Sequence, residues 1–385
     1  MRALTYRGVE SLAYETVADP AIRAPGDAIV RVEAAAVCGS DLHVYHGREV
    51  PDAGTVMGHE LAGEVVETGA GAGDLRPGDR VVAPFTTSCG GCFFCRCGLT
   101  ARCERGELFG WIEGGRGLHG AQAEYARVPL AASTLVRVPE GLPAERALLA
   151  GDVLATGFYG AERAGAAPGA VVAVVGCGAV GLCSAIAARE LGAERVFALD
   201  PVAERRVLAE RFGAEALDPG AAPAAEDSRR GGRAGTGLDE AGADQPGAAA
   251  VEAVREATGG RGADAVVEAV GTPAATRLAV ALARPGGTIA ALGVHHEAAL
   301  ALSPAEAYDK NLTYRAGRCP ARHYLPRLLD LLAAGRIDPA PLISHRLPLA
   351  AGAAAYALFA ARRGGCVKAV LFPSGGLFQP PSPRE

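Results

Sequence analysis

The sequence predicts an α/β protein with two domains, one β-rich and one built on a doubly wound parallel sheet. Three observations support this fold class. A length of 385 residues is too long for one hydrophobic core. Residues 1–150 contain short strand-like runs separated by Gly and Pro, whereas apolar runs alternate with Ala-rich stretches from about residue 169. A Gly-rich turn at 176–181 joins one apolar run directly to a helical pattern.

We expect the domain boundaries where this texture changes. The β-rich domain is predicted over 1–153 and the parallel-sheet domain over 154–314. Residues 315–372 return to mixed helix and strand and are assigned to the first domain. Residues 219–249 and 373–385 are dominated by Ala, Gly, Pro and charge, so we predict a solvated, disordered insertion and a disordered tail.

Short apolar runs locate the individual elements. Residues 28–33 and 80–83 are strand-like, and the turn signal Pro77-Gly78-Asp79 precedes the second of them. For the rest of the chain we expect strands at 170–175, 196–199, 265–269, 288–292 and 366–371, a helix of good formers at 182–191, and a helix directly after 271–273.

Composition and charge exclude several classes of partner. The net charge is −5 without a basic cluster, which argues against nucleic acid or an anionic membrane. Hydrophobic residues make up 49% of the chain, yet no apolar run reaches transmembrane length and the N-terminus lacks the apolar stretch of an export signal. Half of the ten cysteines fall within 89–103, which favours metal binding over secreted disulfides. We therefore expect a cytoplasmic protein.

Four cysteines follow the spacing Cys89-x2-Cys92-x2-Cys95-x7-Cys103. Thiolates this close in sequence can surround one tetrahedral Zn²⁺ and leave no coordination position open, which is typical of a structural site. The alternative is a loop rich in Cys and Gly that binds no metal. Cys97 lies in the same segment as a fifth thiol and is left out of the ligand set. We predict a structural zinc lobe over about 89–103.

The turn Gly176-Cys177-Gly178-Ala179-Val180-Gly181 predicts a dinucleotide site. A G-x-G-x-x-G pattern alone is weak evidence, but here it follows a strand and opens a helix. The first glycine permits a tight turn, the second lets the backbone approach a pyrophosphate, and the third lets helix and strand pack closely. We assign Gly176, Gly178, Val180 and Gly181 to cofactor binding.

Asp200 ends the next strand, where a carboxylate can accept the ribose hydroxyls of adenosine. A 2′-phosphate there would meet a like charge, which favours NAD over NADP, although Arg205 and Arg206 keep NADP open. Asp200 could instead cap the turn that follows its strand. Lys368, near the last strand, could contact the pyrophosphate or simply be solvated.

Cys38 and His59 are candidates for a second, catalytic zinc. One Cys, one His and a third protein ligand, with an open fourth position, describe such a site. Asp152 is the candidate third ligand. Each has a structural alternative, because a single cysteine is usually a core residue and Asp152 could cap the following helix. Their combination with a cysteine lobe and a dinucleotide turn favours the metal.

These motifs resemble those of the zinc-dependent medium-chain alcohol dehydrogenases. The resemblance rests on Gly58-His59-Glu60-x2-Gly63-x5-Gly69, the cysteine lobe and the 176–181 turn, in this order. It extends over roughly 1–218 and 250–372, and it implies a GroES-like catalytic domain and a Rossmann coenzyme domain. Asp152 and the run at 120–125 look most like the formaldehyde-dehydrogenase-like branch of this family.

The resemblance also implies two zinc ions per chain, one structural and one catalytic. Cys38, His59 and Asp152 would hold the catalytic ion, and Glu60 would lie just behind it or bind it transiently. Asp41 would orient His59 by accepting its remaining ring N–H.

The implied activity is oxidation of an alcohol to an aldehyde or ketone, with hydride transfer to NAD from a zinc-bound alkoxide. Ser40 would accept the hydroxyl proton and His43 would pass it to solvent. A polyol, threonine-type or S-hydroxymethylglutathione substrate is an alternative in the same class. A non-catalytic NAD-binding protein is an alternative from another class, but the retained ligands argue against it. By analogy with the family we expect a small-molecule substrate and a homodimer or homotetramer.

Overall fold

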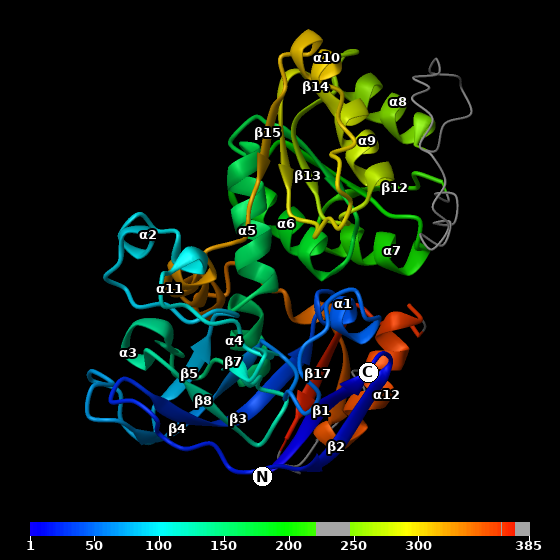
Figure 1. Ribbon diagram of the computed structural model, residues 1–385. Helices are drawn as coiled ribbons and strands as arrows, with labels where there is room; N and C mark the ends of the chain where they lie inside the picture. Colours follow the sequence, from blue (N-terminus) through cyan, green and yellow to red (C-terminus); the bar gives the residue numbers. More distant parts are fainter. Residues whose placement is uncertain (221–246, 363, 374–385) are drawn as a thin grey trace, which may run out of the picture. The chain divides into compact units, whose positions relative to one another are not determined.

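Two units make up the chain in a computed structural model, which describes residues 1–220, 247–362 and 364–373 (Figure 1). One unit comprises residues 1–156 and the chain from 318, and the other comprises residues 157–317. The first boundary lies inside α5 (Val153–Ala164), close to the predicted boundary at 153/154. Most of the predicted insertion and tail lies outside the described residues, but 248 and 249 belong to a helix rather than to the insertion.

The first unit is organised around β3 (Ala28–Val37), whose small apolar side chains are mostly buried. β3 pairs antiparallel with β4 (Leu61–Thr68), β8 (Tyr125–Val128) and β17 (Lys368–Phe372). The full seven-stranded sheet has the order β16-β17-β3-β4-β5-β9, with β8 also on β3. Strands form here because short runs of Val, Ile and Ala can be buried on a pleated sheet.

The first unit has seven further strands and six α-helices within the described residues. The strands are β1 (Arg2–Gly8), β2 (Ser11–Thr16), β5 (Arg80–Ala83), β6 (Trp111–Glu113), β7 (Arg116–Leu118), β9 (Val136–Arg137) and β16 (Ile343–Pro348). The helices are α1 (Asp41–Tyr45), α2 (Phe93–Arg96), α3 (Ala131–Thr134), α4 (Ala144–Ala150), α11 (Ala321–Ala333) and α12 (Gly352–Ala360).

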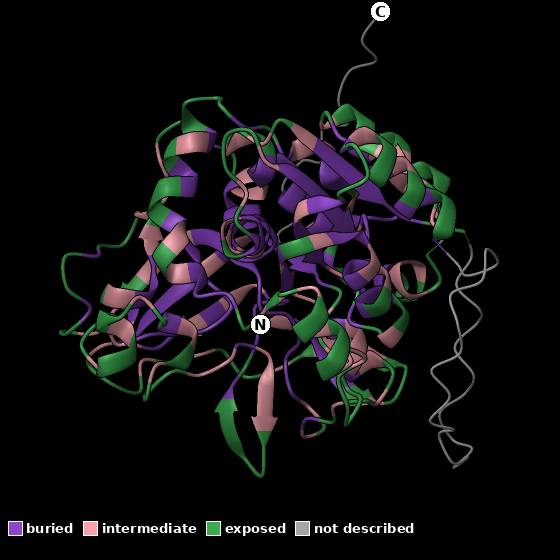
Figure 2. Ribbon diagram, turned by 90° about the horizontal axis from the view of Figure 1, so that it is seen from above, coloured by how far each residue is buried: buried purple, intermediate pink, exposed green. Residues whose placement is uncertain are grey.

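The second unit contains a six-stranded parallel sheet of order β12-β11-β10-β13-β14-β15. Every residue of β10 (Val171–Val175) is buried, as expected for a strand covered on both faces. Figure 2 colours the buried segments of the chain purple. The chain order reverses direction between β10 and β13, which is the position where such sheets bind ligands. The other elements are β11 (Arg195–Leu199), β12 (Glu215–Leu217), β13 (Ala263–Glu268), β14 (Ala283–Ala291), β15 (Thr313–Ala316), α6 (Ala179–Glu190), α7 (Ala203–Arg211), α8 (Ala248–Ala257), α9 (Pro273–Leu282) and α10 (Pro304–Asp309).

The predicted strands are all present, with shifted ends. β14 begins at Ala283 rather than at 288. The prediction missed its first half because Pro285, Gly286 and Gly287 interrupt the apolar run on which it was based. The helix after the glycine turn begins at Ala179, three residues before its expected start. Among the described residues, no helix has the length and apolar character needed to span a membrane.

Register brings distant residues to one end of the first sheet. The last residues of β3 pair with the first residues of both β4 and β17. Cys38 follows β3 directly, His59 and Glu60 precede β4, and Lys368 opens β17. Asp152 lies at the junction of α4 and α5. Strand pairing therefore gathers three segments of the chain around one point.

Candidate metal and nucleotide sites

A buried cluster at this end of the sheet contains Cys38, His59, Glu60 and Asp152, whose ligand atoms lie within 4.8 Å of one another. Asp152 Oδ2 lies 3.3 Å from both Cys38 Sγ and His59 Nε2. Ligands of a tetrahedral zinc with bonds of about 2.0–2.3 Å are separated by roughly 3.3–3.7 Å. The three predicted ligands thus stand at the spacing that a zinc tetrahedron requires.

Glu60 gives a second indication that the cluster suits a cation. Its side chain is fully buried, and its Oε1 accepts a hydrogen bond from Lys368 Nζ. Its Oε2 has no hydrogen-bond partner among the described residues. An unpaired carboxylate oxygen is costly in a buried site, and a cation held by the neighbouring ligands would compensate it. Thiolate, imidazole and carboxylate together are a donor set that suits Zn²⁺.

Asp41 fixes the orientation of two of these ligands at once. Its Oδ1 lies 3.1 Å from His59 Nδ1, and its Oδ2 accepts the backbone N–H of Cys38 at 2.9 Å. A carboxylate on Nδ1 selects the ring tautomer whose Nε2 can bind a metal. Ser40 Oγ lies 3.4 Å from that Nε2, and Phe85 packs edge-on against the ring. His43 lies on α1 and is partly buried.

Burial and ion pairing act in opposite directions on the acidic groups of the cluster. Burial raises the pKa of Glu60 to about 7, although the Lys368 ammonium works against that rise. Burial also disfavours the charged form of Asp152, but the hydrogen bond with His59 outweighs it and holds the pKa of Asp152 well below its usual range. Burial raises the pKa of the Cys38 thiol, and the charge of Asp152 raises it further.

The sequence did not indicate the role that Lys368 has in the first unit. The solvated alternative is wrong, because the residue is 0% exposed. Its ammonium pairs with Glu60, and this pair keeps the pKa of Lys368 above its ordinary value despite burial. The contact with a pyrophosphate stays a prediction, which this ion pair does not support. The sequence signal that could have indicated a buried ion pair is the position of Lys368 at the start of a strand that is otherwise apolar.

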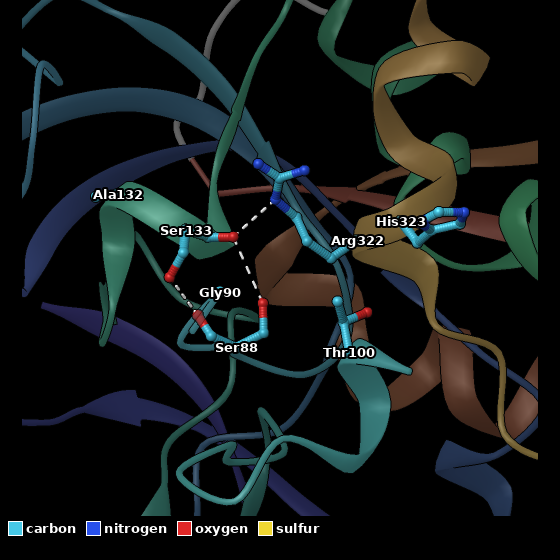
Figure 3. Close-up of a pocket in the computed structure, with 7 residues that line it drawn as sticks. All are labelled: Ser88, Gly90, Thr100, Ala132, Ser133, Arg322 and His323. Atoms are coloured by element: carbon cyan, nitrogen blue, oxygen red, sulfur yellow. Dashed lines mark hydrogen bonds between the residues drawn. The ribbon is translucent and has the colours of Figure 1, made fainter. Parts of the chain in front are cut away.

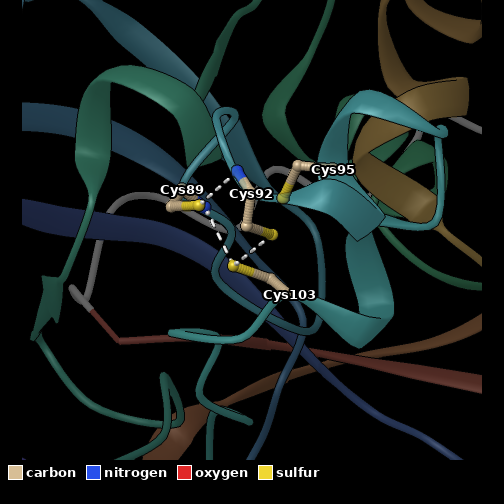
Figure 4. Close-up of side chains that lie close together, drawn as sticks. All are labelled: Cys89, Cys92, Cys95 and Cys103. Carbon is tan, nitrogen blue, oxygen red and sulfur yellow. Dashed lines mark hydrogen bonds between the residues drawn. The ribbon is translucent and has the colours of Figure 1, made fainter.

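The cysteine lobe forms the second cluster, with the four predicted Sγ atoms within 4.8 Å of one another (Figure 4). Cys92 Sγ and Cys103 Sγ are 4.0 Å apart, near the roughly 3.8 Å edge of a zinc tetrahedron with Zn–S bonds of about 2.3 Å. The backbone N–H of Cys89 donates to Cys103 Sγ at 3.2 Å, which stabilises a thiolate. Cys97 is exposed and is not among the clustered thiols.

The glycine turn of the second unit has room for a phosphate where the sequence placed one. Gly176 has φ of +93°, and a Cβ at Gly181 would lie 1.7 Å from the carbonyl oxygen of Gly176. A side chain is therefore excluded at both positions. A Cβ at Gly178 would meet no atom within 4 Å, and Gly178 stands immediately before the first residue of α6. Open space at a helix N-terminus beside backbone N–H groups suits a pyrophosphate.

Asp200 lies directly after β11, beside this turn. Its Oδ2 accepts the backbone N–H of Cys177 at 2.8 Å, and its Oδ1 accepts that of Val202 at 2.8 Å. The second bond is the turn-capping role that we considered as an alternative. Arg205 Nη1 lies 3.7 Å from Oδ2. Asp200 thus ties the glycine turn to its own strand end and places a carboxylate next to both.

Comparisons with known proteins agree with this geometry. The alcohol dehydrogenase GroES-like domain family matches residues 24–140, and the zinc-binding dehydrogenase family matches residues 179–334. Zinc-type alcohol dehydrogenase B from Aspergillus flavus is 39% identical over 97% of this chain and 82% of its own length. A glutathione-independent formaldehyde dehydrogenase from Pseudomonas aeruginosa is 36% identical, but over only 56% of this chain and 58% of its own.

Solved structures give the same result. Alcohol dehydrogenase TADH from Thermus sp. ATN1 matches with a TM-score of 0.84 and 37% identity, over 97% of this chain and 99% of that chain. A zinc-binding dehydrogenase from Sinorhizobium meliloti 1021, bound to NADP, matches with a TM-score of 0.79 and 28% identity, over 97% and 99%. The chain belongs to the zinc-dependent medium-chain alcohol dehydrogenase family and is an oxidoreductase of the predicted α/β fold.

Proposed function

We propose that this family member oxidises an alcohol to an aldehyde or ketone by hydride transfer to NAD, with a catalytic zinc held by Cys38, His59 and Asp152. The observation that carries the proposal is the set of three buried donors, in which Asp152 Oδ2 lies 3.3 Å from each of the other two. Three protein ligands leave a fourth position for the substrate oxygen, which distinguishes a catalytic from a structural zinc.

The zinc, when bound, would act as a Lewis acid that lowers the pKa of the alcohol. Ser40 would take the hydroxyl proton, and the 3.4 Å distance from its Oγ to His59 Nε2, the nitrogen that would bind the zinc, supports this role. His43, one helical turn along the same segment, would pass that proton to solvent. Asp41 keeps His59 in the ligating tautomer, and the Glu60–Lys368 pair keeps the charge behind the ligands balanced.

The glycine turn and Asp200 would hold the nucleotide. Gly178 leaves open space for the pyrophosphate, and the Asp200 carboxylate would accept the adenosine ribose hydroxyls. This carboxylate favours NAD, whereas Arg205 and Arg206 beside it are the features that would favour NADP. We further propose that the cysteine lobe holds a structural zinc, which gives two zinc ions per chain.

The substrate remains a choice within one class. The relative named as a glutathione-independent formaldehyde dehydrogenase supports formaldehyde as a second candidate substrate. We also expect a homodimer or homotetramer, since β15 is the outer strand of the parallel sheet and has no second partner strand among the described residues. A cytoplasmic location stays a prediction.

NADH formation followed by absorbance tests the proposal. Purified protein would be given NAD or NADP with primary and secondary alcohols, polyols, threonine, and formaldehyde with and without glutathione. Turnover of simple alcohols is expected, and activity with formaldehyde only in the presence of glutathione would move the enzyme to the hydroxymethyl-thiol class. A zinc-loaded protein that is silent across the panel would contradict the proposed substrate class.

The Asp200→Gly variant tests the nucleotide assignment. We expect the KM for NAD to rise at least about tenfold, because the ribose loses its carboxylate partner, while the KM for the alcohol changes little. Arg211→Gln, on the exposed end of α7, is the control. Better turnover of NADP than of NAD by the unaltered enzyme would show that Asp200 does not select the cofactor.

A further inference from the structure

We propose that the first unit has an anion site at the base of the cysteine lobe, suited to the phosphate group of a small metabolite. A pocket of about 430 Å³ lies between the lobe, α3 and the first turn of α11 (Figure 3). Its polar lining comes from Ser88, Thr100, Ser133, Arg322 and His323. This volume falls in the range of small-molecule sites, and no acidic residue lines the pocket.

Arg322 supplies a cation that no carboxylate neutralises in the described part of the chain. Its Nε donates to the backbone oxygen of Ser133 at 2.8 Å, which fixes the guanidinium on the wall of the pocket. Partial burial lowers the pKa of Arg322. Its two terminal nitrogens remain available, and a guanidinium fork matches the oxygens of a phosphate. A partly desolvated cation without a partner is stabilised when an anion binds.

Thr100 and α11 supply independent evidence for a ligand. Thr100 is 9% exposed, and its hydroxyl has no hydrogen-bond partner among the described residues. A buried hydroxyl normally finds a partner. The Thr100 oxygen has almost no accessible surface, so it would reach an anion in the pocket by rotation about the Cα–Cβ bond. α11 begins at Ala321 without a side-chain cap, so the positive end of its dipole stands beside Arg322.

Ser88 and Ser133 form part of the pocket wall, and their hydroxyl groups bind protein backbone rather than the proposed anion. Ser133 Oγ donates to the backbone oxygen of Ser88, and Ser88 Oγ lies 3.5 Å from the backbone oxygen of Ser133. These bonds join α3 to the residue that precedes Cys89. Thr100 opens the 3-10 turn that ends just before Cys103. An anion held by Arg322 and Thr100 would therefore fasten α11 to both ends of the cysteine lobe.

Calorimetric titration with inorganic phosphate tests the site, with chloride at equal ionic strength as reference. The protein is first saturated with NADH, so that the glycine turn is filled. We expect one phosphate per chain, at least tenfold weaker binding in Arg322→Gln and about threefold weaker binding in Thr100→Val. Arg211→Gln removes the same charge from the second unit and should bind phosphate normally.

Two outcomes overturn the proposal. One is an absence of phosphate binding to the unaltered protein, and the other is unchanged binding in both pocket variants, which would place the ion elsewhere. Thr100→Val is nearly isosteric and carries the test if Arg322→Gln does not fold. The comparison of variants can be repeated without NADH, so a failure of the proposed cofactor assignment would not be confused with a failure of the anion site.

Discussion

The cysteine lobe and the buried cluster are two candidate zinc sites built in opposite ways. The lobe takes its thiols from residues 89–103, and each of them is only partly buried. The cluster joins Cys38, His59 and Asp152 from three distant segments, each at most 9% exposed. Four thiolates would close a zinc site in the lobe, whereas three mixed donors would leave one position open in the cluster. There Asp41 lies against His59, and Lys368 pairs with the buried Glu60. Ligands that are neighbours in the chain suffice for a structural metal site. The candidate catalytic site, by contrast, depends on the fold of the first sheet to bring its ligands together.

Cys38→Ser should give the largest effect and separate the two sites. Loss of the proposed thiolate ligand should lower kcat/KM at least about a thousandfold, because the catalytic zinc would supply the activation of the alcohol. NADH binding, measured by fluorescence, should persist, since the glycine turn belongs to the other unit. Zinc analysis should show the ion of the lobe alone. Cys97→Ser is the matched control, and equal loss of NADH binding in Cys38→Ser would sink the assignment.

Lys368→Met should destabilise the cluster by about 3–5 kcal/mol, measured by denaturant unfolding, because it leaves Glu60 buried without its partner. The double variant with Glu60→Gln should recover much of this loss, since a buried amide carries no charge. Lys368→Arg is the control that keeps the charge. If the two single changes simply add in the double variant, the pair does not act as a unit.

Cys92→Ser should act on stability rather than on chemistry. A lobe with three thiolates should hold zinc poorly, and we expect the midpoint of thermal unfolding to fall by at least about 5 °C. Proteases should then cleave within 89–103, while the zinc of the buried cluster is retained. Cys97→Ser again serves as control, because its thiol lies outside the cluster. An unchanged unfolding midpoint and an unchanged zinc content would contradict the proposal that the cysteine lobe holds a structural zinc.

The two sites also differ in how far the sequence could predict them. The lobe could be located from spacing alone, because its ligands are neighbours in the chain. The glycine turn was equally local, and Gly178 has the open space that its position in the motif predicted. Asp152 could be named as a candidate ligand, and the family resemblance gave it its role. Its proximity to Cys38 depends on how the junction of α4 and α5 packs against the sheet, which the sequence does not show. The Glu60–Lys368 pair joins residues 308 positions apart, and a fully buried lysine contradicts the usual preference of that side chain. It could not be predicted.

Asp41→Asn should produce the smallest effect and show how the buried cluster depends on its surroundings. An asparagine keeps the shape of the side chain but weakens the contact with His59 Nδ1, so the ligating tautomer is no longer held. We expect the zinc affinity of this cluster, measured by competition with a chelator, to fall about ten- to a hundredfold, with kcat reduced in the zinc-loaded enzyme. Among the described residues no carboxylate contacts the lobe thiols, so the zinc proposed there should exchange as in the unaltered protein. Unchanged affinity in the cluster would mean that packing against Phe85, rather than the carboxylate, orients the ring.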